Sequence, residues 1–257
     1  MGSDATNVTS EEYLELRRQL KSLNKPAVKS IKTAHGDILD CVDIYKQPAL
    51  DHPLLKDHKI QMWPTSFPKR SEGMKNSSAS GMEIRVELPD GGCPQGTVPI
   101  RRTRMQDLLR IKSLPKLKNK AINENWVSVQ TPGGGPYYGA RADMNVWNPW
   151  VGNEKQLSLE QFWIVGGDND DVINTVEAGW MADGYQQTGC YNTFCPGFVQ
   201  VSRDVIPGSP IVPISIYDGN QYHIVLQAFQ VKPHLPLHKP QFPPIISYDG
   251  SRLDVAS

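Results

Sequence analysis

The sequence lacks a long apolar run and a net charge. No segment reaches the roughly 18 consecutive apolar residues that a membrane-spanning helix needs, and the N-terminus has no apolar stretch of the kind found in secretory signals. Lysine and arginine number 27, as do aspartate and glutamate, so the formal net charge is zero. Because a neutral chain has no overall field that attracts nucleic acid or anionic lipid, we expect neither nucleic acid nor a membrane as a partner.

The sequence is also poor in motifs for nucleophilic, metal and phosphate chemistry. It has no Gly-x-Ser-x-Gly turn and no Cys-x-x-Cys pair, and its six histidines are scattered. A serine or cysteine nucleophile and a structural zinc site are therefore disfavoured. Gly133, Gly134 and Gly135 precede a proline instead of a helix start, which favours a loop over a phosphate cradle. We predict no metal and no cofactor, and among enzyme mechanisms we favour one that uses carboxylates.

Glycine and proline, in contrast, are abundant. The 257 residues include 21 of each, more than a helical bundle tolerates, while 39% hydrophobic residues are too many for a disordered chain. The chain is long enough for one large all-β domain or for two ordinary domains. These numbers favour strands and turns.

The first hundred or so residues predict a small mixed α and β domain. Thr9 and Glu12 form a capping box, and apolar residues recur at helical spacing up to Leu23 before Pro26 ends the helix. Short strands are expected at residues 37–42 and 82–88, and residues 99–111 are expected to form an arginine-rich entry into a short helix. Because a lysine-rich stretch ends at Lys120, we place a domain boundary there, with the first domain over residues 1–120.

A second domain over residues 121–230 is predicted to be an antiparallel β-sandwich. Apolar and polar residues alternate within segments that turn residues separate. The expected strands cover residues 126–131, 138–147, 161–165, 172–180, 198–202, 211–217 and 222–229. Five prolines between Pro233 and Pro244 mark the remaining residues 231–257 as a tail. Its composition fits a proline-rich ligand for a partner, and fits a disordered tail better.

Glu177 is the residue that most suggests chemistry. It interrupts an apolar strand and is followed by Gly179, which permits close approach of a ligand backbone, and by the aromatic Trp180. Burial at such a place would raise the pKa of the carboxyl group and suit it to general acid or base catalysis. The alternative is that Glu177 faces solvent on the outer side of the sandwich. Aromatic residues on the strands also allow carbohydrate recognition, although core packing explains them better: Trp147, Trp150 and Trp163.

The four cysteines leave two interpretations open. Their even number is compatible with two disulfides, and buried free thiols are the alternative. Glycosylation sequons at Asn7 and Asn76 fit an exported chain. Residues 1–6 fit a myristoylation pattern, but no polybasic stretch follows to strengthen such an anchor. A missing upstream signal peptide fits the sequence better.

Several long motifs resemble, in order, the plant neprosin family. Leu23 to Ile31, the step Asp40 to Val42, and Gly92 to Leu109 resemble the family's activation peptide. Further motifs resemble its catalytic domain: Tyr138 to Ala140, Asn145 to Trp147, Trp163 to Ile164, Val176 to Trp180, Ala182 to Asn192 and Cys195 to Gln200. The resemblance covers the chain from about Thr9 to about Ala228.

The resemblance implies a secreted, extracellular glutamic endopeptidase that cleaves on the carboxyl side of proline. Such an enzyme is made as a zymogen whose activation domain inhibits it within the same molecule, and it uses two glutamates in a groove of a concanavalin-like, glutamic-peptidase sandwich. Glu177 matches the first glutamate. The resemblance further implies that the groove is lined by Trp180, Asp183, Tyr185 and Gln186, and that disulfides join Cys190 to Cys195 and Cys41 to Cys93. Two neighbouring carboxylates that share a proton would favour acidic pH.

The sequence also departs from the family pattern. A signal peptide is missing, a segment between Trp180 and Ala182 is missing, and after Gln230 no residue matches the second glutamate. We therefore expect an incomplete sandwich, a truncated family member and an inactive or nearly inactive peptidase. The alternative function is a non-catalytic product that binds or inhibits.

Overall fold

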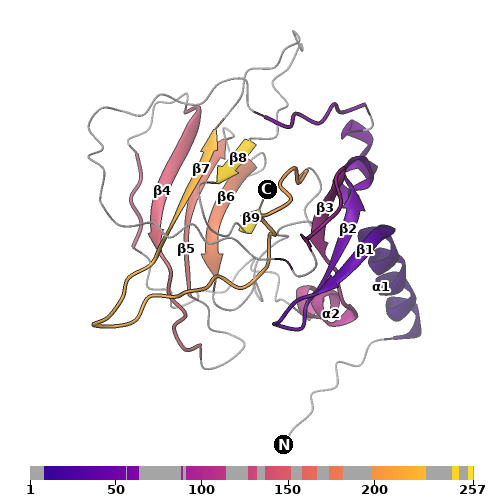
Figure 1. Ribbon diagram of the computed structural model, residues 1–257, viewed down its shortest axis with the longest axis horizontal. Coiled ribbons are helices and arrows are strands. Elements are labelled where there is room, and N and C mark those ends of the chain that lie inside the picture. Colours follow the sequence, from indigo (N-terminus) through magenta and orange to yellow (C-terminus); the bar gives the residue numbers. More distant parts are fainter. Residues whose placement is uncertain are drawn as a thin grey trace, which may run out of the picture.

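The computed structural model describes residues 9–55, 57–63, 88, 91–113, 127–131, 137–151, 158–166, 174–181, 198–229, 245–248 and 254–256. Within these residues the strands form three small antiparallel sheets, and helices are few (Figure 1). We call residues 9–113 the N-terminal part and residues 127–256 the C-terminal part. The fold is therefore rich in β-structure, as the composition predicted.

The N-terminal part combines a single sheet with two helices. Its sheet has the order β1-β2-β3, and helices α1 and α2 lie beside it (Figure 1). The elements are α1 (Ser10–Leu23), β1 (Ala27–Lys32), β2 (Ile38–Asp43), β3 (Thr97–Arg101) and α2 (Met105–Ser113), with 3-10 turns at Ile44–Lys46, Pro48–Asp51 and Pro53–Leu55. The segment at residues 99–111, expected to lead into a helix, thus begins as a strand.

Helix α1 begins where the capping box was predicted. The backbone N–H of Glu12 donates to the Thr9 hydroxyl at 3.2 Å, and the Glu12 carboxylate accepts from the backbone N–H of Thr9 at 3.0 Å. Both bonds occupy backbone donors that a helix start leaves without a partner. The local sequence therefore fixes this end of the helix.

The central strand β2 carries the core of the N-terminal part. Leu39 and Cys41 are fully buried and pack with Ile31 and Cys93, while Val42 packs with residues of β3. A central strand pairs along both edges, and the buried residues 39–42 show that both faces of β2 are covered as well. This explains why β2 reads as a short continuous apolar run in the sequence.

The C-terminal part contains a pair of sheets that share an apolar cluster. The sheets have the orders β4-β7-β8 and β5-β6-β9. Their strands are β4 (Gly139–Asn145), β5 (Leu159–Gly166), β6 (Asn174–Met181), β7 (His223–Phe229), β8 (Ile245–Tyr248) and β9 (Asp254–Ala256). Met144, Ile224 and Leu226 of the first sheet pack with Ala178 of the second. A face-to-face sandwich fits this shared cluster and stays a prediction.

Three predicted strands are wrong in the described residues. Residues 127–131, 198–202 and 211–217 are not strands. For residues 198–202 the physical reason is visible: a glutamine side chain of the N-terminal part, and not a neighbouring strand, bonds the backbone of Gln200. Alternation of residue types cannot tell whether the backbone N–H and C=O groups bond to a neighbouring strand or to a side chain.

The tail also departs from the expectation of a disordered chain end. Residues 245–248 pair with β7 and residues 254–256 pair with β6, so each adds a strand to one of the two C-terminal sheets. Other predictions lie outside the described residues: the sequons at Asn7 and Asn76, the strand at 82–88 up to residue 87, the lysine-rich end of the first domain at 114–120, and the prolines at 233–244.

Candidate functional site

Glu177 lies in the middle of β6, between β5 and β9. In the register of the sheet it is opposite Trp163 on one side and opposite Ala256 on the other. Its neighbour Ala178 is fully buried in the apolar cluster. Because successive side chains of a strand point to opposite faces, Glu177 lies on the face turned away from that cluster. There the Glu177 side chain is half-buried. The sequence left two alternatives open, a buried acid and a solvent-exposed side chain, and the observed exposure lies between them.

Gly179 brings strands β5 and β6 close together at the site. A Cβ atom at this position would lie 2.1 Å from the carbonyl oxygen of Glu160 and 2.5 Å from the Cα of Gln161. Both atoms belong to the backbone of β5 and cannot move aside without separating the strands. The sequence predicted that this glycine admits a ligand backbone, whereas here it admits the neighbouring strand, two residues from Glu177.

An amide and an indole from β5 complete the described face around Glu177. The Gln161 side-chain N–H donates to the Glu177 carboxylate, with Nε2 and Oε2 3.5 Å apart. Trp163, directly opposite Glu177, is 51% exposed. The carboxylate therefore lies beside a hydrogen-bond donor and a partly exposed aromatic ring.

Sequence reasoning missed Gln161 and gave Trp163 a different role. A usable signal was present, because Gln161 and Trp163 are two residues apart on one predicted strand and therefore share a face. What the sequence did not provide was the register that places this face beside Glu177. Of the other tryptophans, Trp147 packs against the apolar cluster and Trp150 is exposed.

The other residues of the predicted groove are only partly described. Trp180 is in β6, where its backbone is opposite Glu160. Asp183, Tyr185 and Gln186, and the cysteines Cys190 and Cys195, lie outside the described residues. Their place beside Glu177 stays a prediction.

The structure contains the disulfide between Cys41 and Cys93 that the resemblance implies. It joins the buried strand β2 to the segment before β3, across 52 residues of sequence. Both cysteines are buried in the core of the N-terminal part. A covalent link across a loop of this length restricts the unfolded chain and so stabilises the folded one.

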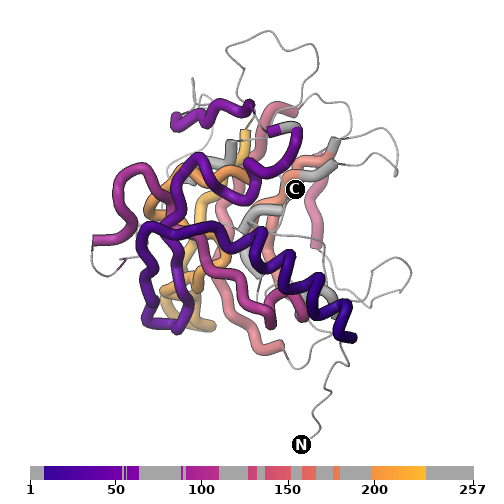
Figure 2. The backbone as a smooth tube through the Cα atoms, turned by 90° about the vertical axis from the view of Figure 1, so that its right-hand side faces the viewer, coloured from indigo at the N-terminus to yellow at the C-terminus, as the bar shows by residue number. Residues whose placement is uncertain are grey.

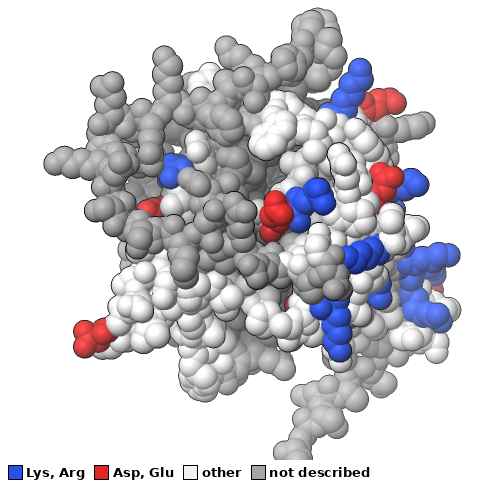
Figure 3. All heavy atoms as spheres, in the orientation of Figure 1, with Lys and Arg blue, Asp and Glu red and all other residues white. Residues whose placement is uncertain are grey.

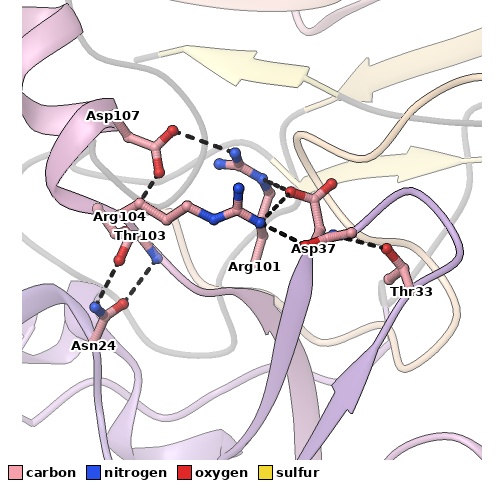
Figure 4. A network of polar contacts seen from close by, with 8 residues as sticks. Asn24, Thr33, Asp37, Arg101, Thr103, Arg104 and Asp107 are labelled. Carbon is pink, nitrogen blue, oxygen red and sulfur yellow. Dashed lines mark hydrogen bonds and ion pairs between the residues drawn. The ribbon is translucent and has the colours of Figure 1, made fainter.

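Paired charges connect the loops and helix of the N-terminal part (Figure 4). Arg101 contacts Asp37 at 3.1 Å and Asp107 of α2 at 3.3 Å, and Arg104 contacts Asp37 at 3.5 Å. Burial by itself would lower the pKa of Arg101, but the two carboxylates outweigh it and raise the pKa above its usual value. Every charge of this network has an opposite partner, so we assign it a structural role.

Asn24 joins the end of α1 to the segment before α2 in the same network. Its side-chain amide donates to the carbonyl oxygen of Thr103 and its side-chain oxygen accepts from the N–H of Thr103, both at 2.9 Å (Figure 4). These two bonds use both ends of the amide. The hollow between α1 and α2 is lined by residues of these two helices alone, mostly by charged and polar side chains of α1.

The described residues offer no clear place for a metal ion and no membrane span. No group of three His, Cys, Asp or Glu side chains among them is arranged to hold a metal. No helix in the described stretches of the chain combines the length and the apolar character needed to cross a bilayer.

Comparison with known families divides the chain in two. A family model described as the neprosin activation peptide matches residues 30–134, and a model described as neprosin matches residues 180–234. The first match contains β2, β3, α2, the disulfide and the second half of β1. The second begins three residues after Glu177 and contains the described segment 198–229. The neprosin match is therefore a partial domain, with the matching residues in the same order as the N-terminal and C-terminal parts of the structure.

Proposed function

The chain belongs to the neprosin family, with an activation peptide followed by a partial neprosin domain, and from this premise we propose that it is a glutamic endopeptidase that cleaves on the carboxyl side of proline. The observation that carries the proposal is the place of Glu177. It is a half-buried carboxylate in mid-strand, turned away from the apolar cluster, with an amide donor and an exposed indole beside it.

In the proposed reaction Glu177 is one of two carboxylates. One, ionised, removes a proton from water as the water oxygen attacks the carbonyl carbon of the proline residue. The other, protonated, gives its proton to the departing amine nitrogen, so that the peptide bond breaks and one proton is taken up for each proton released. Because two neighbouring carboxylates do not both ionise easily, acidic pH maintains the working pair.

Gln161 and Trp163 have proposed roles beside this carboxylate. The Gln161 amide donates to Glu177 and fixes the orientation of its oxygens, which makes Gln161 a positioning residue. The exposed ring of Trp163, opposite Glu177, offers an apolar surface on which the ring of a substrate proline packs. The close approach of β5 and β6 at Gly179 maintains this arrangement.

The N-terminal part is proposed to act as the intramolecular inhibitor of this centre. Its match to an activation peptide supports that role. We also propose that the protein works outside the cell, because the family and the disulfide fit an oxidising compartment. The alternative function is binding or inhibition without catalysis.

The test is cleavage of a proline-containing peptide at acidic pH, followed by mass spectrometry over long incubations. General acid and base catalysis each contribute roughly 10²–10⁴-fold, so cleavage after proline should depend on each carboxylate by about that factor. Glu177→Gln, which keeps the shape of the side chain and removes its charge, should reduce this cleavage by a similar factor.

The matched control is Glu160→Gln. Glu160 is in β5, and its side chain lies on the opposite face of the strand from those of Gln161 and Trp163. This variant should cleave like the unchanged chain. Cleavage that survives Glu177→Gln would contradict the assignment of Glu177. A folded chain that binds the peptide, as measured by tryptophan fluorescence, without cutting it would favour the non-catalytic alternative.

A further inference from the structure

Residues 198–209 of the C-terminal part lie against the N-terminal part, and we call them the docking segment. Figures 1 and 2 both show the orange chain that follows residue 200 lying beside the strands of the N-terminal part. The segment belongs to the neprosin match, whereas its contacts belong to the activation-peptide match. It is therefore a contact surface between the two matched units.

Two buried glutamines bond each other across this surface. Gln47 is 1% exposed and Gln200 is 3% exposed. The Gln47 side-chain N–H donates to the backbone carbonyl of Gln200 at 2.7 Å, and its side-chain oxygen accepts from the backbone N–H of Gln200 at 2.8 Å. The Gln47 amide thus pairs with one residue as a neighbouring strand would, and it does so out of contact with water.

The side chain of Gln200 also contacts the N-terminal part, at the edge strand β3 of its sheet. Its Nε2 donates to the carbonyl oxygen of Pro99 at 2.9 Å and also to two carbonyls of its own segment, those of Ser202 and Val205. Pro99 lies in β3, which is the edge of this sheet among the described strands. An edge strand tolerates a proline and leaves carbonyls to be satisfied, and Gln200 satisfies one of them.

Apolar and charged contacts extend the surface. Ile206, 1% exposed, packs with Leu39 and with both cysteines of the disulfide. Val201 packs on the cluster around Val42. The guanidinium of Arg203 donates to the carbonyl oxygen of Cys93. The docking segment is thus fastened to the two features that hold the N-terminal part together, its central strand and its disulfide.

We propose that the docking segment retains the activation peptide as a non-covalent partner after the chain between the two matched units has been cut. The contacts of the docking segment with the N-terminal part join residues before position 114 to residues after position 197. The Cys41–Cys93 disulfide closes within the N-terminal part and does not bridge the surface. Cleavage between the units therefore removes none of these contacts. This inference concerns retention of the partner and does not depend on the activity of Glu177.

The experiment uses the full chain with a recognition sequence for a site-specific protease in place of residues 116–120 and a tag at the N-terminus. After complete cutting at neutral pH, the two pieces of the wild-type sequence should elute together in size-exclusion chromatography. Separation of the wild-type pieces into two peaks would overturn the proposal.

Gln47→Glu tests the glutamine pair directly. At neutral pH its carboxylate would face the carbonyl oxygen of Gln200 and have no proton to donate, so the pieces should bind about 10- to 100-fold more weakly. At about pH 4 the protonated acid regains the donor, and the ratio of variant to wild-type affinity should return toward one. The matched control Gln19→Glu, on the exposed surface of α1, should behave like the wild type at both pH values.

A second variant avoids a change in the buried core. Arg203 is exposed, so Arg203→Ala leaves the fold intact while removing its bond to Cys93. It should weaken retention by about fivefold, whereas Arg18→Ala on α1 should not change it. Circular dichroism of the uncut chains shows that each variant is folded. Equal retention by Gln47→Glu, Arg203→Ala and their two controls would overturn the proposal even if the wild-type pieces stay together.

Discussion

A disulfide and paired charges join the strands of the N-terminal part, whereas the sheets of the C-terminal part share an apolar cluster. Asp40, although only 4% exposed, is neutralised by Arg102, and Arg101 lies between two carboxylates. In the C-terminal part the described contact of this kind joins His223 Nδ1 to Asp143 Oδ1 at 3.5 Å, and it pairs two charges only when the histidine is protonated. In Figure 3 the described lysines and arginines gather over the side where α1 and the first sheet lie in Figure 1.

The difference follows from how much apolar surface each part can bury. One three-stranded sheet with two short helices encloses a small core, and small units commonly gain stability from a covalent bond. In the C-terminal part, strands of both sheets contribute buried side chains to one apolar cluster. We therefore expect the N-terminal part to unfold more readily when its disulfide or ion pairs are removed. We expect the C-terminal part to unfold more readily when a side chain of its apolar core is truncated.

The largest effect is expected from removing the disulfide. Replacing Cys41 and Cys93 together by serine releases a loop of 52 residues, and loop-closure entropy for that length corresponds to about 4 kcal/mol of unfolding free energy. Hydrogen exchange by mass spectrometry should show β2 amides losing protection while β7 amides keep it. Equal loss of protection in β2 and β7 would mean that both parts unfold together, and it would contradict a separate role of the disulfide in the N-terminal part.

A core truncation in the C-terminal part should act in the opposite way. Leu226 is fully buried in the apolar cluster that the C-terminal sheets share, and Leu226→Ala should cost about 3 kcal/mol through lost burial and the cavity left behind. Leu39→Ala in β2 is the matched substitution, since Leu39 is equally buried. Leu226→Ala should expose β4 and β7 amides, and Leu39→Ala those of β1 and β2. Identical exchange patterns for the two variants would contradict separate cores.

A smaller effect is expected from Arg102→Ala. The Arg102 guanidinium donates to Asp40 with Nε 2.7 Å from Oδ2, and removing it leaves a buried carboxylate with fewer donors. The cost should be about 2 kcal/mol in chemical denaturation. Arg18→Ala, which removes an exposed pair with Glu15, should cost at most about 0.5 kcal/mol. A similar cost for both variants would show that the buried pair contributes no more than a surface pair.

The same pair also makes a prediction about pH. The hydrogen bond from Arg102 to Asp40 is the main cause that raises the pKa of Arg102. A raised pKa in the folded state means that the contribution is complete below the unfolded pKa and is lost only as pH rises through the folded value. Since both values are strongly alkaline, the difference between wild type and Arg102→Ala should be flat from about pH 6 to pH 9. A slope in that range would assign the difference to another group.

Local patterns predicted those elements that short stretches of sequence specify. Thr9 and Glu12 defined the start of α1, and strict alternation defined β4, where Met144 is indeed buried. Residues 198–202 were predicted as a strand in the same way and are not one. They differ because their backbone partner, Gln47, is distant in sequence, and no local pattern encodes such a partner.

The sequence also predicted one part of the candidate site and missed another part. A carboxylate inside an apolar strand identified Glu177, and long motifs in family order identified the family, because both depend on residue types and spacing. The register of β5 against β6 was needed to place Gln161 and Trp163 beside Glu177. Gly179 permits that register because it has no side chain to collide with the backbone of β5. The residues next to Gly179 in the sequence do not reveal this close approach.

Residue types and short motifs were sufficient to predict the family, the order of its two matched units, the first helix and Glu177 as the candidate residue. Each of these rests on residues that are close in the chain or on motifs read in order. The way in which the N-terminal and C-terminal parts meet could not be predicted from such motifs, because the contacts between Gln47 and Gln200, and between Ile206 and the disulfide, join residues more than a hundred positions apart. Their formation depends on the folded arrangement of both parts, which brings buried donors, acceptors and apolar side chains together.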